Sequence, residues 1–120
     1  MLIVVDMDSA TPLHTQIAGQ VRGAIAAGDV AAGERLPPAR ELAGSLGVNV
    51  HTVLRALSTL ADEGLVQVRR GRGTVVTDRG PRVANVATLV RGLVQEARRV
   101  GVSDAEVLRM VDTGLREVEG

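Results

Sequence analysis

The chain has 120 residues, 45% of them hydrophobic and 23% charged, which suffices for one folded domain with a small appendage and excludes a disordered chain. Phe, Trp and Tyr are absent, so the core must be built from aliphatic side chains, which favours amphipathic helices over a large sandwich. Their absence also weighs against single-stranded nucleic acid as a ligand, because proteins that bind it stack bases on aromatic rings.

The charge is balanced overall but not along the chain. Fourteen basic and 14 acidic residues give a net charge of zero, whereas nucleic-acid-binding domains usually carry a basic excess. Every basic residue is Arg, and five arginines lie between positions 69 and 82, where Asp78 is the only acidic residue. The guanidinium group suits forked contacts with phosphate and guanine, so this segment is a candidate nucleic-acid contact.

No segment points to secretion or to a membrane. The chain lacks Cys, which excludes disulfides and fits a reducing compartment. The opening MLIVVDMD is too short an apolar run for a signal peptide and lacks a basic start, and no run reaches transmembrane length. We therefore expect a cytoplasmic protein without a membrane partner.

The N-terminal part predicts a strand and a helix. Residues 2–5 form a short β-rich run. Thr11 and Pro12 predict a helix start, with a capping hydroxyl before a proline at the first helical position. Gly28 ends this helix, and residues 29–37 form a loop. The apolar face of the helix consists of Leu13, Ile17, Val21, Ala24 and Ile25.

A helix, a glycine turn and a longer helix follow. The first opens at Pro38 or Ala39 and ends at Gly47, and Asn49 caps the second, which runs to about Glu63. The core side of the first helix is Leu42, Ala43 and Leu46. In the second helix, Val53, Leu57, Leu60 and Ala61 share one face, with Leu54 packing at its edge. The opposite face carries His51, Arg55, Ser58 and Asp62, with Thr52 beside them.

The next segment predicts a basic hairpin. Residues 65–69 and 74–77 form strands joined by the turn 70–73, which has two arginines and two glycines. A linker at residues 79–82 then separates a winged domain, residues 1–78, from a helical region, residues 83–120.

That helical region predicts two amphipathic helices separated by Gly101. Ser103 and Glu106 form a capping box at the start of the second. The apolar stripe of the first helix is Val83, Val86, Val90, Leu93, Val94 and Ala97. The stripe of the second is Val107, Leu108, Val111, Leu115 and Val118.

The helix–turn–helix and the hairpin together predict a DNA-binding surface. The second helix of such a unit enters the major groove by its N-terminal end, where Arg55 can fork onto guanine and Thr52 can reach a phosphate or a thymine methyl group. The glycines of the hairpin allow close approach to the DNA backbone. The predicted DNA-binding residues are Arg40, Asn49, Val50, His51, Thr52, Arg55, Arg69, Arg70, Gly71 and Arg72.

Each of these side chains also has a purely structural interpretation. Asn49 can be only a helix cap, and His51 only a solvated histidine. Arg55 could pair with Asp62 or Glu63, and Arg40 with the neighbouring Glu41. The arginines of the hairpin could form a solvated turn.

The chain resembles the GntR family of winged helix-turn-helix regulators in PLHTQIAGQVRGAIAAGDVAAGERLPPARELAGSLGVNVHTVLRAL and EGLVQVRRGRGTVV. The likeness covers about Leu2 to Val76, and the short remainder resembles the YtrA-type subfamily. It implies a mainly α-helical fold with a small β wing, a helical tail that dimerises, and control of a transporter operon. Arg40, Asn49, Thr52, Arg55 and Gly71 match the family's DNA-contact positions.

The chain also departs from the family pattern. Val50 stands where many members have Arg or Pro, Leu54 where the metabolite-binding classes often have Arg, and His14 where Tyr is frequent. The base preference therefore cannot be copied from a relative.

The tail predicts a homodimer. A 40-residue unit lacks an independent core, so its two stripes must pack on the winged domain or on a second copy. A symmetric dimer would match an inverted repeat with half-sites about 34 Å apart. The alternative is a monomer with the two helices folded back. The predicted dimerisation residues are Val86, Val90, Leu93, Val94, Val107, Val111 and Leu115.

We do not expect an enzyme, a cofactor or a metal site. His14 and His51 share no metal-ligand spacing, and the serines lie in no nucleophile motif. Residues 71–73 are too few for a phosphate loop and precede a strand. The sequence predicts a transcriptional regulator, a repressor that binds double-stranded operator DNA, and does not identify a small-molecule effector.

The alternative function is a winged-helix module that binds another protein without reading DNA sequence, which the zero net charge favours. A continuous basic surface over Arg40, Arg55 and Arg72 would favour DNA binding. Interruption of that surface by Glu41, Asp62 or Asp78 would favour the interaction module.

Overall fold

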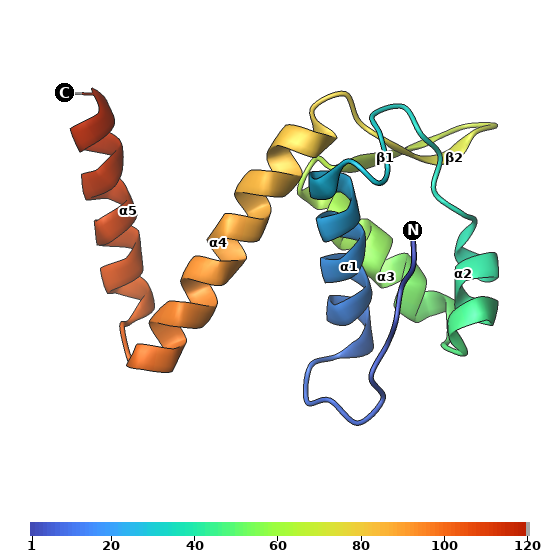
Figure 1. The fold of residues 1–120 in the computed structure, drawn as a ribbon, viewed down its shortest axis with the longest axis horizontal. Coiled ribbons are helices and arrows are strands. Elements are labelled where there is room, and N and C mark those ends of the chain that lie inside the picture. The colour runs from blue at the N-terminus through green and yellow to red at the C-terminus, as the bar shows by residue number, and fades with distance from the viewer. Residues whose placement is uncertain (120) are drawn as a thin grey trace. The chain divides into compact units, whose positions relative to one another are not determined.

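The computed structural model describes residues 1–119 of the chain. Its elements, in order, are α1 (Leu13–Ala27), α2 (Ala39–Leu46), α3 (Val50–Asp62), β1 (Val66–Arg69), β2 (Gly73–Val76), α4 (Gly80–Val100) and α5 (Asp104–Glu119) (Figure 1). The expected fold class, mainly helical with a small β wing, is confirmed. The chain divides into two compact units, and the division falls inside α4, after Thr88. None of the helices in the described range is long and apolar enough to cross a membrane.

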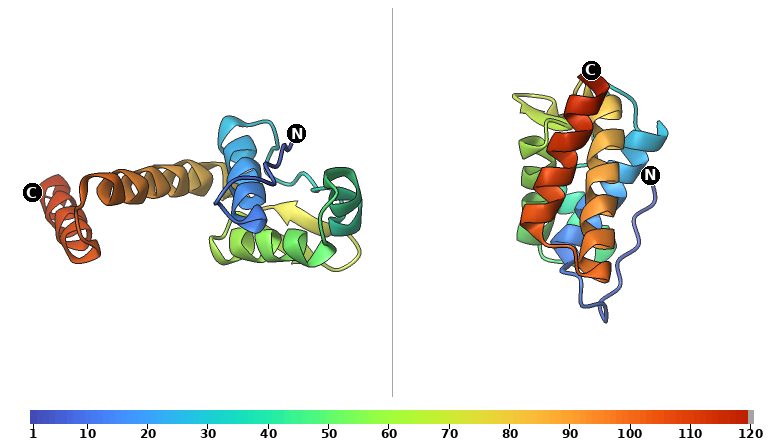
Figure 2. Two further views of the ribbon diagram at one scale, coloured as in Figure 1. Left: turned by 90° about the horizontal axis from the view of Figure 1, so that it is seen from below. Right: turned by 90° about the vertical axis from the view of Figure 1, so that its left-hand side faces the viewer.

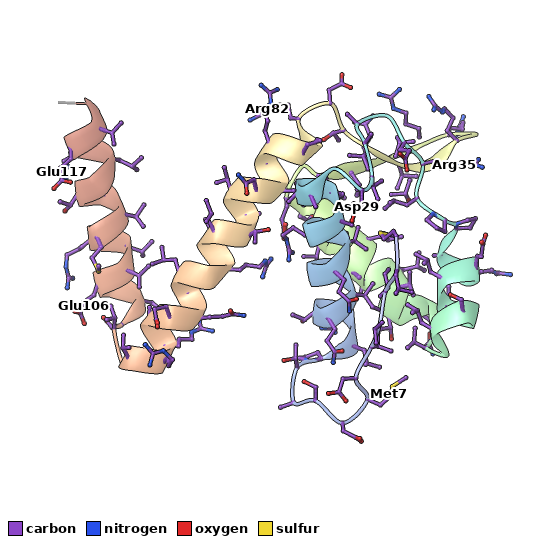
Figure 3. All side chains as sticks on the ribbon, viewed as in Figure 1. Met7, Asp29, Arg35, Arg82, Glu106 and Glu117 are labelled. Carbon is purple, nitrogen blue, oxygen red and sulfur yellow. The ribbon has the colours of Figure 1, made fainter. Side chains whose placement is uncertain are left out.

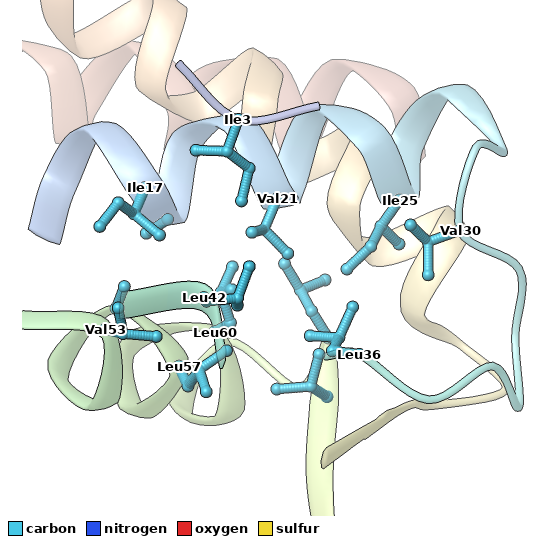
Figure 4. Packing of buried hydrophobic residues seen from close by; sticks show 14 of the residues in the cluster. Ile3, Ile17, Val21, Ile25, Val30, Leu36, Leu42, Val53, Leu57 and Leu60 are labelled. Carbon is cyan, nitrogen blue, oxygen red and sulfur yellow. The ribbon is translucent and has the colours of Figure 1, made fainter. Parts of the chain in front are cut away.

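The core of the first unit lies between α1, α2 and α3, with α1 and α3 packed against each other (Figure 2). Figure 4 shows Ile17, Val21 and Ile25 of α1 facing Leu57 and Leu60 of α3. Burial of each such side chain contributes about 1.5–3 kcal/mol, so this aliphatic cluster fixes α3 on its support without any aromatic residue.

The predicted N-terminal strand is wrong. Residues 2–5 are extended but pair with no other strand. Instead, Val4 exchanges hydrogen bonds with the side-chain amide of Gln20, whose Oε1 accepts from the Val4 backbone N at 2.8 Å. Gln16, one turn earlier on α1, does the same for Asp6 at 2.8 and 3.0 Å. Two glutamines on one helix face thus take the place of a strand partner, and Ile3 is buried between them and the core.

Two details of the helices also differ from expectation. Pro12, and not Thr11, occupies the N-cap of α1, and no side chain caps that end. On α3, Ala61 was predicted on the apolar face but is exposed, and Ala56, which was not assigned to that face, is buried. The core face of α3 is rotated toward Ala56 because α3 packs against both α1 and α2.

Residues 79–82 are not a linker, because α4 begins at Gly80. Gly80 is buried, and its backbone N donates to the Thr77 carbonyl at 3.0 Å. A Cβ at this position would lie 2.8 Å from both the Leu65 carbonyl oxygen and Val76 Cγ1. Only glycine permits this approach, so the first turn of α4 packs directly on the winged unit, with Ala84 fully buried.

A buried ion pair that the sequence did not reveal joins α1 to the end of α3. The Arg22 side chain is 5% exposed, and its Nε and a terminal nitrogen donate to the two carboxylate oxygens of Glu63 at 2.9 and 2.5 Å. Forked pairs of this kind are the strong form of a charge-assisted hydrogen bond.

The second unit contains the rest of α4 and α5. The predicted capping box is confirmed: the Glu106 backbone N donates to Ser103 Oγ at 3.2 Å, and the Glu106 carboxylate accepts from Ser103. Most apolar side chains of this unit remain exposed, including Leu93 at 37%, Val111 at 42% and Leu115 at 62%. Two helices cannot cover both of their own stripes, which agrees with the expectation from their size.

Candidate nucleic-acid interface

The N-terminal half of α3 presents a polar face to the surface. His51 and Arg55 are exposed on the side opposite the buried Val53 and Leu57. Asn49 caps the helix, since its Oδ1 accepts from the His51 backbone N at 2.8 Å. This cap was predicted, and it sets the direction in which α3 leaves the turn after α2.

The arginines on this surface have no acidic partners. In the described part of the chain, neither Arg40 of α2 nor Arg55 forms an ion pair. Glu63, the partner considered for Arg55, is held by Arg22 instead. The interpretation of Arg55 and Arg40 as surface ion pairs is therefore wrong, and both guanidinium groups are available to a ligand.

Three other side chains of α3 lie between the buried face and the polar face of the helix, or differ from the predicted position. Thr52 is half-buried, and Val50 packs partly against the core. Leu54 was expected to pack at the edge of the apolar face, but it is 46% exposed and lies outside the core cluster. The buried face of α3 does not include Leu54, because that face is rotated toward Ala56.

The basic hairpin forms the expected antiparallel pair, in register from Val66 opposite Val76 to Arg69 opposite Gly73. The turn closes with a hydrogen bond from the Arg72 backbone N to the Arg69 carbonyl at 3.0 Å. Gly71 at its tip has φ +79° and open space around it, a conformation that side-chain-bearing residues rarely adopt. Arg69, Arg70 and Arg72 are all exposed.

Arg35 is a candidate contact residue that the sequence did not reveal. The loop before α2 runs along β2 as a further edge, with a bridge between Arg35 and Val75 and a hydrogen bond from the Leu36 N to the Thr74 carbonyl at 2.8 Å. The exposed Arg35 side chain lies against the hairpin, with its Cδ 3.7 Å from the Cβ position of Gly73 (Figure 3). In the sequence, the change from the charged Glu34 and Arg35 to the apolar Leu36 is the signal that could have pointed to it.

Acidic side chains border the basic surface. Asp78 shares a hollow of about 300 Å³ with Arg69 and Arg72 of the wing, although no ion pair joins them among the described residues. Asp62 lies at the far end of α3, about 16 Å from His51 at 1.5 Å per residue. Glu41 is exposed in the first turn of α2, next to Arg40. Acidic groups thus lie beside the wing, on α2 and at the distal end of α3, and they border the basic surface on each of these elements.

No metal centre is apparent at this surface. Across residues 1–119, no three His, Asp or Glu side chains gather closely enough to hold an ion. What the arrangement offers is a set of exposed guanidinium groups on α2, α3 and the wing, together with the N-terminal end of α3.

Comparison with known proteins gives the same fold and the same placement of the helix–turn–helix. The model of "Bacterial regulatory proteins, gntR family" matches residues 13–76. Transcriptional regulator Rv1152 of Mycobacterium tuberculosis is 35% identical over 105 residues, 88% of this chain and 87% of that protein. The transcriptional repressor YtrA of Bacillus subtilis is 33% identical over 107 residues, 87% of this chain and 78% of that protein. Some curated relatives are longer: the chain spans 41% of one that is 40% identical over 102 residues.

Solved structures of related proteins share the fold. YtrA from Sulfolobus acidocaldarius, a GntR-family transcription factor, is 39% identical, covers 78% of this chain and 99% of that one, and superposes with a TM-score of 0.62. The DNA-binding domain of AraR in complex with operator ORE1 covers 64% of this chain and 94% of that one, at 25% identity and a TM-score of 0.54. The expectation of a regulator and not an enzyme agrees with these relatives. The chain belongs to the GntR family of DNA-binding transcriptional regulators, in its short YtrA-type form.

Proposed function

We propose that this protein is a homodimeric repressor that acts in the cytoplasm by occupying an inverted-repeat operator in double-stranded DNA. The observation that carries the proposal is the unpaired Arg55 beside His51 on the exposed N-terminal half of α3, with the arginine wing following in the same unit. AraR, whose DNA-binding domain has the same fold, has been solved bound to an operator.

The reading residues lie on α3 and on the turn before it. Arg55 forks onto the N7 and O6 of a guanine, because a guanidinium matches that pair of acceptors. His51 lies on the same side of the helix one turn earlier and reaches the neighbouring base pair or phosphate. Asn49 and Thr52 contact the backbone at the helix N-terminus, where a phosphate is favoured by the helix dipole. Val50, the first residue of α3, lies at the same end of the helix and is also proposed to contact the DNA.

The remaining contacts are to phosphates. Arg40 on α2 binds the backbone at one side of the groove. On the other side the wing places Gly71 at the closest approach, with Arg69, Arg70 and Arg72 around it, and Arg35 extends this row from the adjacent edge. Such contacts fix the register of the protein on the duplex without reading its sequence.

The dimer is supported by apolar side chains that the described chain leaves uncovered. Val86, Val90 and Leu93 of α4 are exposed by 58%, 51% and 37%. Monomeric proteins rarely leave so many aliphatic side chains together in water. The second copy would cover Val86, Val90, Leu93, Val94, Val107, Val111 and Leu115. Repression, by analogy with the B. subtilis relative named as a repressor, follows from a dimer that blocks access to a promoter.

Selection from a random duplex library by the purified protein, followed by a salt titration on the selected sequence, tests the proposal. We expect a palindromic consensus, and a log affinity that falls linearly with log salt. Binding without sequence preference, or no binding at all, would favour the alternative of a protein-interaction module. An affinity that does not change with salt would contradict the phosphate contacts.

A further inference from the structure

Two stripes of different chemistry run side by side along the N-terminal half of α3. Residues four positions apart lie on the same side of a helix, so His51 and Arg55 form a polar stripe and Val50 and Leu54 an apolar one. Leu54 is 46% exposed, and Val50 is only partly buried. The apolar stripe therefore continues from the edge of the core onto the surface next to Arg55.

The exposure of Leu54 is not required by packing. The contacts of α3 with α1 and α2 are filled by Val53, Ala56, Leu57 and Leu60, all of them buried. Leu54 belongs neither to the buried cluster nor to the partly buried residues that pack against it. A single exposed leucine on an ordinary surface needs no explanation. This one lies beside the guanidinium that we assign to the major groove, where water is displaced on binding.

We propose that Val50 and Leu54 read thymine through its 5-methyl group. This inference rests on the proposed function and identifies the kind of sequence that the operator contains. The thymine methyl is the apolar group that the major groove displays, and it marks T·A pairs among the four possible pairs. Arg55 on the adjacent stripe takes a guanine. Each half-site therefore carries guanine and thymine within about one or two base pairs of each other, since the two side chains differ by one residue along the helix.

A chemical double-mutant cycle tests the contact. Each thymine of the selected operator is replaced in turn by deoxyuridine, which removes the methyl group and keeps the base pair. We expect one or more positions per half-site where this change weakens binding by about three- to tenfold, the scale of one buried methyl or methylene group. Leu54→Ala should weaken binding to the thymine operator by a similar factor, and the two losses should not multiply.

Two further variants make the cycle specific. Leu54→Met keeps an apolar side chain of similar size and should retain most of the preference for thymine over deoxyuridine. Leu2→Ala removes a leucine that is 86% exposed and lies outside α3, so it should leave the deoxyuridine effect at its wild-type size. Because Leu54 is half exposed, Leu54→Ala should keep the thermal midpoint of the wild-type protein, which circular dichroism checks.

The experiment distinguishes failure of the thymine contact from failure of the proposed function. Equal deoxyuridine losses in wild-type protein and Leu54→Ala, no loss at any thymine, or a selected operator without thymine would each overturn the inference while leaving sequence-specific binding intact. Failure of the selection to yield any operator would instead overturn the proposed function and this inference with it. A deoxyuridine effect that disappears only in Leu54→Ala supports the contact.

Discussion

Arg22 on α1 holds Glu63, the residue that ends α3, through two hydrogen bonds of 2.9 and 2.5 Å in a setting where the Arg22 side chain is 5% exposed. The pair ties the C-terminal end of α3, the helix that we propose reads the DNA, to α1, which supports it. Arg22 lies on the buried face of α1 among aliphatic residues, so its charge depends on Glu63 for compensation.

Loss of one partner of this pair should destabilise the fold. Glu63→Gln leaves the Arg22 charge buried without its carboxylate, and we expect the free energy of unfolding to fall by about 3 kcal/mol. Urea denaturation followed by circular dichroism measures it. Arg116→Ala is the matched control, because Arg116 forms an exposed pair with Asp112 on α5, and its loss should cost about 0.5 kcal/mol or less. Equal effects of the two variants would show that the buried pair has no special role.

Gly80 should not tolerate a side chain. In Gly80→Ala the new Cβ would meet the Leu65 carbonyl oxygen and Val76 Cγ1 at 2.8 Å, and relief of this clash should cost about 1–3 kcal/mol. Gly92→Ala on the same helix meets nothing within 4 Å and should stabilise α4 by about 0.5–1 kcal/mol through helix propensity. Thermal unfolding of both variants measures the contrast. A stabilised Gly80→Ala protein would contradict the contact between α4 and the wing.

Arg55→Ala should relax the sequence preference. Loss of a bidentate guanine contact should weaken operator binding by about 1–3 kcal/mol and leave the affinity for random duplex DNA nearly unchanged. Fluorescence anisotropy with both duplexes measures the two affinities. Arg109→Ala, which removes one charge from α5 outside the winged domain, is the control. Equal losses on operator and random DNA would rule out a reading role for Arg55.

Arg35→Ala and Arg72→Ala should behave differently from Arg55→Ala. Each removes a proposed phosphate contact, so the affinity for every duplex should fall alike, and the slope of log affinity against log salt should decrease by about 1. The measurement is the same anisotropy assay repeated over a range of salt concentrations. If Arg35→Ala keeps the wild-type slope while Arg72→Ala does not, the edge strand beside the wing does not reach the DNA.

A charge on the exposed apolar face of the tail should separate the dimer. Leu93→Glu or Val111→Glu would place a carboxylate at the proposed interface, and we expect a monomer in sedimentation analysis, with operator affinity reduced because one half-site is lost. Leu2→Glu adds the same charge at an exposed leucine of the first unit and should leave the oligomeric state unchanged. A wild-type protein that already sediments as a monomer would contradict the dimer itself.

The sequence alone determined the five helices, the hairpin and much of the candidate surface, because the signals for these act within one or two turns. Asn49 caps α3 by bonding to His51, two residues away, and Ser103 with Glu106 caps α5 in the same local way. Gly47 ends α2, and the apolar period of α3 places His51 and Arg55 on its outer face. The arginine-rich turn and its register likewise follow from residues close together in the chain.

Only the tertiary structure decided which surfaces are covered, because that depends on residues distant in sequence. Gln16 and Gln20 replace a strand partner for the N-terminal segment, and the bridge from Arg35 to Val75 spans 40 positions. Gly80 begins a helix and not a linker, and its lack of a side chain lets it lie close to Leu65 and Val76. Helical periodicity identifies the apolar face of α3, but it does not determine how much of that face α1 and α2 bury. The packing of three helices therefore left Leu54 exposed beside Arg55, where the local pattern predicted a packing residue at the edge of the apolar face.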